Sequence, residues 1–215
     1  MVKFQIRFLF ILSSVFLPGA CNQYRHLQKI QDDETCIQKF RPDLSNVIYR
    51  TSVDVVGKHL SGLLIFRSMP DSSFRVVFTN EMGLSFFDFG FLPGNGFEVY
   101  QVVPQFDKKS VIKTLRKDFD LVMFRNLDSI SKRYSLKDSS LVYHACPQPD
   151  GINYYITDAG CHQLIKMQRS SAKKPVVEAF IMGGSPEISP DSILIRHLNF
   201  EFTITLKKIT PVVAQ

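Results

Sequence analysis

Short runs of β-branched and aromatic residues, separated by turn-forming residues, follow one another from residue 46 almost to the end of the chain. In the run VIYRTSVDVV at 47–56, every second side chain from Val47 to Val55 is on the same side. Side chains point alternately to the two faces of a β-strand, and stretches such as LPGNG at 92–96 favour turns. The pattern therefore predicts an antiparallel β-meander.

One helix interrupts these runs, at about 108–124. Asp107 is the expected N-cap, because an aspartate side chain can accept hydrogen bonds from the free N–H groups of the first turn. The apolar residues of the helix fall within an arc of about 120°. They are Val111, Ile112, Leu115, Phe119, Val122 and Met123.

About ten or eleven strands and one helix make this a mainly β chain. The last run places Phe200, Phe202, Ile204 and Leu206 on one inner face. Such a sheet must bury its apolar face, so we predict a strongly curved antiparallel sheet, or incomplete β-barrel, with the helix covering the open side. We assign residues 46–210 to this single open-barrel domain. The polar segment 21–45 is expected to be a lipidated N-terminus and tether, with one short element around 36–40 as an alternative.

The first twenty residues have the layout of a secretory signal peptide. Lys3 and Arg7 precede an apolar stretch at 8–16, and small residues follow it. This stretch is shorter than the roughly 20 residues that cross a bilayer, so a transmembrane helix is the weaker interpretation. Residues 1–20 are therefore expected to be a signal peptide.

The stretch LPGAC at 17–21 resembles a bacterial lipobox. The resemblance implies that Cys21 becomes the new N-terminus and carries acyl chains such as palmitate. The alternatives are ordinary secretion, although Pro18 fits poorly at the −3 position of the usual cleavage site, and a buried free cysteine. We expect a lipid-anchored protein of the cell envelope, most simply at the outer membrane and facing the periplasm.

The charge of the chain does not favour nucleic acid as a partner. Loss of the leader would lower the formal net charge from +6 to +4, because it removes Lys3 and Arg7 and no acidic residue. The remaining basic residues are scattered, whereas a nucleic-acid interface concentrates them on one face.

The pairs His144/Cys146 and Cys161/His162 are close enough in sequence to suggest zinc. In a meander, however, Cys146 and Cys161 lie at opposite ends of one strand, roughly 15–20 Å apart. A Zn–S bond is only about 2.3 Å long, so we predict that these cysteines bind no metal and are not bonded to each other. Together with Cys36 they leave two alternatives, which are one disulfide with one free thiol or three free thiols.

No group of residues predicts catalysis. The DFG at 88–90 lies in a strand-like run without a glycine-rich phosphate loop, and GGSP at 183–186 lacks the frame of a nucleophile elbow. We interpret Asp88 as a satisfied carboxylate at the rim of the sheet, and His59, His144 and His197 as structural. We expect no enzyme activity, no catalytic residues and no cofactor.

The run LSFFDFGFLPGNGF at 84–97 is the richest apolar feature. Phe87, Phe89 and Phe91 share one face of the expected strand, with Leu84 and Phe86 on the other. Phenylalanine on both faces is typical of a strand that is buried on both sides or lines a cavity. We therefore take Phe87, Phe89 and Phe91 as candidate cavity residues, with Leu92 in an apolar loop; ordinary core packing is the alternative.

The lipobox, the segment SGLLIF at 61–66, the helix, and the final pair SILIRHLNFEFTITL at 192–206 together resemble the LolA/LolB-type lipoprotein carrier superfamily. The resemblance implies an unclosed barrel with a helical lid and a cavity for acyl chains. It also implies that Leu92 engages a membrane. We expect the protein to bind or transfer a lipid or lipidated protein; a non-enzymatic envelope scaffold with a packed core is the alternative.

Overall fold

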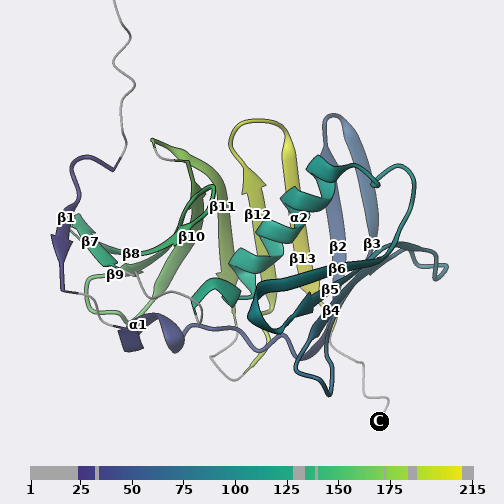
Figure 1. Cartoon of the computed structure of the whole chain (residues 1–215), viewed down its shortest axis with the longest axis horizontal. Helices are drawn as coiled ribbons and strands as arrows, with labels where there is room; N and C mark the ends of the chain where they lie inside the picture. Colours follow the sequence, from purple (N-terminus) through teal and green to yellow (C-terminus); the bar gives the residue numbers. More distant parts are fainter. Residues whose placement is uncertain are drawn as a thin grey trace, which may run out of the picture.

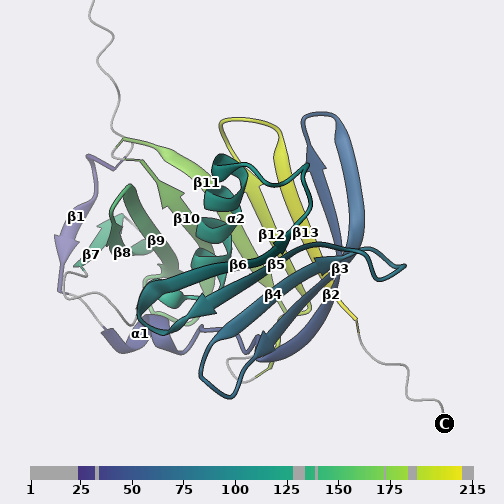
Figure 2. The ribbon, with the colours of Figure 1, turned by 45° about the vertical axis from the view of Figure 1, so that its right-hand side comes forward.

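The computed structural model describes residues 24–31, 34–127, 134–138, 140–171, 173–183 and 188–209. Within these residues the fold is one antiparallel sheet of 13 strands, in the order β1-β7-β8-β9-β10-β11-β12-β13-β2-β3-β4-β5-β6. The sheet curves around the helix α2 and its two edge strands, β1 and β6, are not paired with each other (Figures 1 and 2). The predicted mainly β fold with an unclosed, curved sheet is confirmed.

The chain builds this sheet from two meanders. The first contains β2 to β6 and the second β7 to β13, and β13 pairs with β2 to join them. The strands are β1 (Gln28–Ile30), β2 (Asn46–Val55), β3 (Lys58–Ser68), β4 (Phe74–Thr79), β5 (Ser85–Leu92), β6 (Gly96–Val102), β7 (Tyr134–Asp138), β8 (Leu141–Gln148), β9 (Gly151–Asp158), β10 (Leu164–Ser170), β11 (Pro175–Met182), β12 (Ser192–His197) and β13 (Phe202–Lys208).

The part of the chain that the structure describes has four helical elements. They are α1 (Glu34–Gln38), α2 (Lys109–Val122) and the short 3-10 turns η1 (Pro93–Asn95) and η2 (Arg125–Leu127). The predicted helix is confirmed, but Asp107 is not its cap: Lys108 is the N-cap residue and makes no side-chain capping bond. Figure 1 shows α2 crossing the concave side of the sheet between β11 and β6.

Register irregularities and one glycine help the sheet to curve. Register shifts occur in the pairs β4–β5 and β5–β6, and again along β10. Such irregularities bend a strand and increase its twist. In β3, a Cβ on Gly62 would lie 2.2 Å from the carbonyl oxygen of Thr79, so this close approach of β3 to β4 requires glycine.

The core lies between the concave face and α2. Alternation in β2 buries Val47, Tyr49 and Thr51 against it, as the sequence predicts. From the helix, Leu115 and Phe119 are among the buried residues that enter the same core. The two meanders therefore share one apolar core.

The segment from Tyr24 to residue 45 differs from the expected tether, because its described residues are part of the fold. β1 pairs with β7 at the edge of the sheet. Tyr24 stacks on Tyr154 of β9, with ring centroids 4.6 Å apart. Cys36 and Ile37 of α1 are buried in the main core. A short polar sequence gives no periodic signal, and these contacts come from residues more than a hundred positions away.

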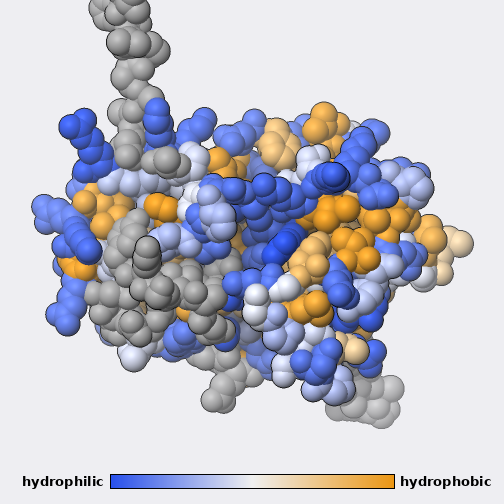
Figure 3. Space-filling model, viewed as in Figure 1, coloured by the Kyte–Doolittle hydropathy of each residue, from blue (hydrophilic) through white to orange (hydrophobic). Residues whose placement is uncertain are grey.

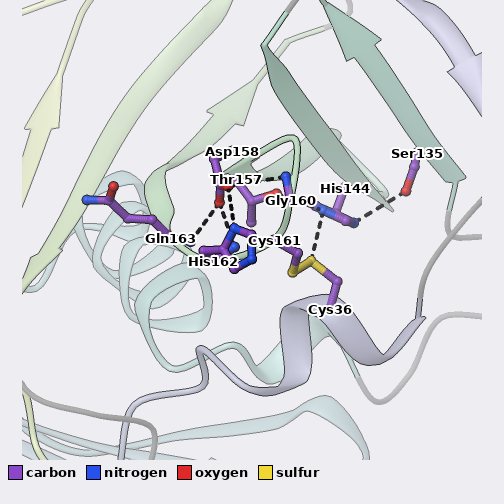
Figure 4. Close-up of a disulfide and its surroundings, with 9 residues drawn as sticks. All are labelled: Cys36, Ser135, His144, Thr157, Asp158, Gly160, Cys161, His162 and Gln163. Atoms are coloured by element: carbon purple, nitrogen blue, oxygen red, sulfur yellow. Dashed lines mark hydrogen bonds and ion pairs between the residues drawn. A yellow bond between two sulfur atoms is a disulfide. The ribbon is translucent and has the colours of Figure 1, made fainter.

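A disulfide fastens this segment to the second meander. Cys36 of α1 is bonded to Cys161 in the loop between β9 and β10, with Cα atoms 6.0 Å apart (Figure 4). Cys161 is therefore not bonded to Cys146, as predicted, and Cys146 is buried and does not belong to this disulfide. Of the two alternatives that the sequence left open, the one with a single disulfide is observed.

Candidate functional site

An apolar cavity of about 690 Å³ opens on one side of α2, between the helix and the concave face of the sheet. Its walls come from β2, β3, β4, β5 and β13, from the N-terminal half of α2, and from the segment that precedes the helix. Figure 3 shows apolar side chains gathered on this side of α2, to the right of the hydrophilic side chains that cover the middle of the view. The cavity is a large hollow within an otherwise packed core.

Strand alternation supplies the sheet wall. Val53 and Val55 of β2 point to the same face as the buried Val47 and Tyr49, but they are only partly buried because nothing fills the space above them. Ile204 of β13 is their neighbour on that wall. The two ends of β2 thus differ: one end is packed and the other is open to the cavity.

The helix wall mixes apolar and small polar residues. Val111, Leu115 and Phe119 form its apolar line, and Ser110 and Thr114 lie beside them. Phe86 and Phe106, whose rings are 5.9 Å apart in an edge-on arrangement, continue the apolar lining between β5 and the start of the helix. A long apolar chain would meet almost only hydrocarbon along this surface.

Polar groups are confined to a few positions of the lining. Lys58 and Lys108 are both exposed and line the cavity, together with Gln105. Phe200, in the turn between β12 and β13, lines it too and remains 49% exposed. No carboxylate is found among the described lining residues. The cavity is therefore apolar, with positive charge at exposed positions of its border.

Of the four residues predicted from sequence, only Phe87 is among the described residues that line the cavity. Phe87 lines the cavity, whereas Phe89 and Phe91 are completely buried and do not line it. The rings of Phe87 and Phe89 are stacked 4.4 Å apart, and Phe91 packs edge-on against Phe119 at 6.3 Å. Leu92 ends β5, is partly buried, and accepts a hydrogen bond at its carbonyl from Arg125 Nη2 at 2.6 Å.

Most lining residues were missed from the sequence. Val53 and Val55 share one side of their run, but apolar alternation is the same for a packed and an open wall. Lys58, Phe78 and Phe106 come from three separate segments, and nothing in the sequence indicates that they meet.

A buried ionic cluster holds α2 in place. Asp118 is fully buried, and its two carboxylate oxygens accept hydrogen bonds from Arg169 Nη2 of β10 at 2.7 Å and His197 Nε2 of β12 at 2.8 Å. A buried carboxylate is tolerated only when it is paired and hydrogen-bonded. The helix that bounds the cavity is thus anchored to the second meander by directed bonds as well as by apolar packing.

The other polar residues singled out in the sequence have structural partners. Asp88 pairs with Arg75, whose Nε donates to Asp88 Oδ1 at 2.8 Å. His59 pairs with Asp54 at 2.6 Å on the surface. These contacts, and the bond of His197 to Asp118, give Asp88, His59 and His197 each a partner within the fold.

His144 lies beside the disulfide (Figure 4). Its Nδ1 is 3.3 Å from Ser135 Oγ, and its Nε2 is 3.3 Å from Thr157 Oγ1 and 3.5 Å from Cys36 Sγ. The imidazole is therefore held among neighbouring strands and the disulfide, which agrees with the structural role inferred for it.

Within the described ranges, no three or more His, Cys, Asp or Glu side chains gather as a metal site. None of the helices in the described part of the chain combines the length and the apolar composition needed to span a bilayer. The proposed lipid attachment site, Cys21, and the signal peptide 1–20 lie outside the described residues.

The chain matches no protein-family model, and no curated protein matches it. Several solved structures are similar to it, among them these three. A LolA superfamily protein from Nitrosomonas europaea has a TM-score of 0.44 at 9% identity, covering 82% of this chain and 89% of that one. A DUF1329 family protein from Desulfovibrio piger has 0.41 at 10%, covering 84% and 92%. A putative outer membrane lipoprotein-sorting protein domain from Vibrio parahaemolyticus has 0.41 at 5%, covering 85% and 92%. These scores are too low to support a functional argument.

Proposed function

We propose that this protein binds a lipid, or the acyl chain of a lipidated protein, in the apolar cavity beside α2. The observation that carries the proposal is the cavity itself. Its volume of about 690 Å³ is in the range of about 300–1,000 Å³ that is usual for ligand sites. Burying an acyl chain there would gain about 0.8 kcal/mol for each methylene removed from water.

The border of the cavity suits the polar end of such a ligand. Lys58 and Lys108 bring positive charge to exposed positions of the lining, and no carboxylate among the described lining residues opposes it. An acyl chain could therefore lie against Val53, Leu115 and Phe87 while its polar group stays in water near the lysines. In this role the protein binds or hands over its ligand and carries out no reaction, so catalytic residues and a cofactor are not needed.

We further propose that Cys21 carries the lipid anchor and that residues 1–20 are its signal peptide. This part of the proposal rests on the LPGAC stretch at 17–21. It places the protein in the cell envelope, attached to the outer membrane and facing the periplasm. A membrane-attached cavity would meet lipids and lipidated proteins directly.

The test is to identify bound lipid and then to block the cavity. Full-length protein, purified gently, is extracted and analysed by mass spectrometry, and acyl-chain binding is measured with a fluorescent fatty acid. Val111→Trp places a large side chain in the cavity from α2, whereas Val99→Trp makes the same change on β6, where the side chain is 40% exposed and outside the cavity. We expect the affinity of Val111→Trp for the fatty acid to fall at least about tenfold, and that of Val99→Trp to equal the affinity of the parent protein.

Two results would count against a carrier. One is the absence of lipid in the extract together with no fatty-acid binding by the unmodified chain. The other is equal binding by both tryptophan variants, provided that both melt near the temperature of the parent protein. Either result would favour the envelope scaffold, whose interior is only a packed core, as it is around the fully buried Phe89 and Phe91.

A further inference from the structure

The helix α2 has a second hollow on its other side. This polar groove has a volume of about 390 Å³ and lies between α2, the turn that joins β8 and β9, and the adjoining ends of β9, β10 and β11. Helix residues such as Lys113 and Lys117 line it, whereas Val111, Leu115 and Phe119 line the apolar cavity. The concave side of the sheet thus holds two chemically different hollows, separated by one helix.

Two residues that line the groove each have a buried polar atom without a partner in the described structure. Asn153 of β9 and Arg169 of β10 are opposite each other in the register of the two strands. Asn153 is only 2% exposed, and within the described structure neither its Oδ1 nor the Nε of Arg169 makes a hydrogen bond. Arg169 is nevertheless fixed in place, because its Nη2 donates to the buried Asp118 at 2.7 Å.

These two atoms specify what kind of group would fit between them. The Arg169 Nε–H is a donor and Asn153 Oδ1 is an acceptor. Leaving either of them buried without a partner costs free energy, so a group that accepts from one and donates to the other is favoured. A hydroxyl group does both, while a carboxylate or an ammonium can do only one.

The rim of the groove carries surplus positive charge. Asp150 Oδ2 is shared by Lys113 Nζ at 2.9 Å and Lys117 Nζ at 2.5 Å. The two lysines hold the pKa of Asp150 down at about 2, so it is ionised at neutral pH and still neutralises only one of them. The other basic residues that line the groove have carboxylate partners of their own, since Arg116 pairs with Asp120 and Arg169 pairs with Asp118. The surplus charge on the rim therefore comes from the two lysines that share Asp150.

We propose that this groove binds a small anionic polyol that carries a phosphate group, with a hydroxyl on Asn153 and Arg169 and the phosphate near Lys113 and Lys117. Lysine is a common ligand of phosphate, to which it offers a compact charge and three donors. The same chemistry occurs in free phosphorylated polyols and in the headgroup of a phosphoglycerol lipid. The site is separate from the apolar cavity and does not depend on the function proposed for it.

The experiment titrates the full-length protein by calorimetry with glycerol 3-phosphate, inorganic phosphate and glycerol. We expect glycerol 3-phosphate to bind at least about tenfold more tightly than inorganic phosphate or glycerol. It alone has both a hydroxyl for Asn153 and Arg169 and a phosphate for the lysines of the rim. No binding of glycerol 3-phosphate would overturn the proposal. Equal binding of inorganic phosphate would overturn the role of Asn153 and Arg169.

Variants locate the site. Asn153→Asp keeps the shape of the side chain, and the new carboxylate can accept a hydrogen bond from Arg169 Nε, so we expect the fold to be retained. Because the added negative charge repels an anion, binding of glycerol 3-phosphate should weaken about tenfold or more. Lys113→Gln removes one rim charge and should weaken binding several-fold. Lys207→Gln changes an exposed lysine of β13 outside the groove and should have no effect. Equal affinity in all three would overturn the assignment.

Vesicles distinguish the two sources of the ligand. Phosphatidylcholine vesicles with and without phosphatidylglycerol are added as competitors of glycerol 3-phosphate. Competition by the phosphatidylglycerol vesicles alone identifies a lipid headgroup, and no competition identifies a free phosphorylated polyol. Fatty-acid binding by Lys113→Gln should equal that of the parent protein. The proposal for the groove can therefore fail without affecting the proposal for the apolar cavity.

Discussion

At the scale of single residues, neighbouring phenylalanines of one strand have different surroundings. Phe87 and Phe89 lie on the same face of β5 and their rings stack. Phe89 is enclosed on all sides, whereas Phe87 has the apolar cavity on one side. The contribution of a side chain to stability depends on how many neighbours it loses when it is removed, so the two should not be equivalent.

We expect Phe89→Ala to lower the free energy of unfolding by about 3–5 kcal/mol, because it removes a fully buried ring and leaves a void. Phe87→Ala should cost clearly less, since part of its surface already faces an open space, and it should weaken acyl-chain binding. Urea unfolding and fatty-acid binding measure the two effects. Equal losses of stability would mean that Phe87 is an ordinary core residue.

At the scale of elements, the N-terminal segment depends on the second meander for its position. α1 has only five residues, which is too short to be stable alone. The Cys36–Cys161 bond joins it to the loop between β9 and β10, across a sequence separation of 125 residues. This loop is itself ordered by Asp158, whose Oδ1 accepts hydrogen bonds from the backbone N–H groups of His162 and Gln163, both at 2.7 Å.

Removing this link should destabilise the whole domain. A cross-link that closes a long loop restricts the unfolded chain, and its loss typically costs about 2–5 kcal/mol. We expect Cys36→Ala/Cys161→Ala to melt at a lower temperature and to be cleaved faster by protease within residues 24–45. Dithiothreitol should lower the melting temperature of the parent protein and leave that of the double variant unchanged. A parent protein that is insensitive to reductant would contradict this.

At the scale of the whole molecule, the position of the N-terminal segment bears on how far the domain would lie from a membrane. The proposed anchor at Cys21 is three residues before Tyr24, which packs on the outer face of β9. The domain would therefore be held close to the membrane surface, with little free chain between the anchor and the fold. This differs from the long tether expected from sequence.

Changing Cys21 to serine tests the anchor. Two acyl chains on one residue bind a bilayer stably, because each buried methylene contributes about 0.8 kcal/mol. We expect Cys21→Ser to abolish labelling by radioactive palmitate and to leave the protein soluble or unprocessed. Cys146→Ser, which changes the buried cysteine outside the disulfide, serves as the control and should keep both label and membrane attachment. Unchanged labelling of Cys21→Ser would contradict lipidation at this site.

The sequence by itself determined the strands β2 to β6 and β8 to β13, the helix α2 and the general curvature of the sheet. These follow from local alternation and helical periodicity, which each segment carries in its own residues. The short strands β1 and β7 were missed, since QKI and YSLKD are too short and polar to show a period. The separation of Cys146 from Cys161 also followed from strand geometry alone.

Only the tertiary structure decided which part of the apolar interior is filled and which is open. Val47 and Val53 alternate in the same way, yet the first is buried in the main core and the second faces the cavity. The choice of Cys36 as the partner of Cys161, and the meeting of Asp118 with Arg169 and His197, were decided there too. The physical reason is common to all three: the residues involved are far apart in the chain, and local sequence patterns contain no information about which distant side chains will meet.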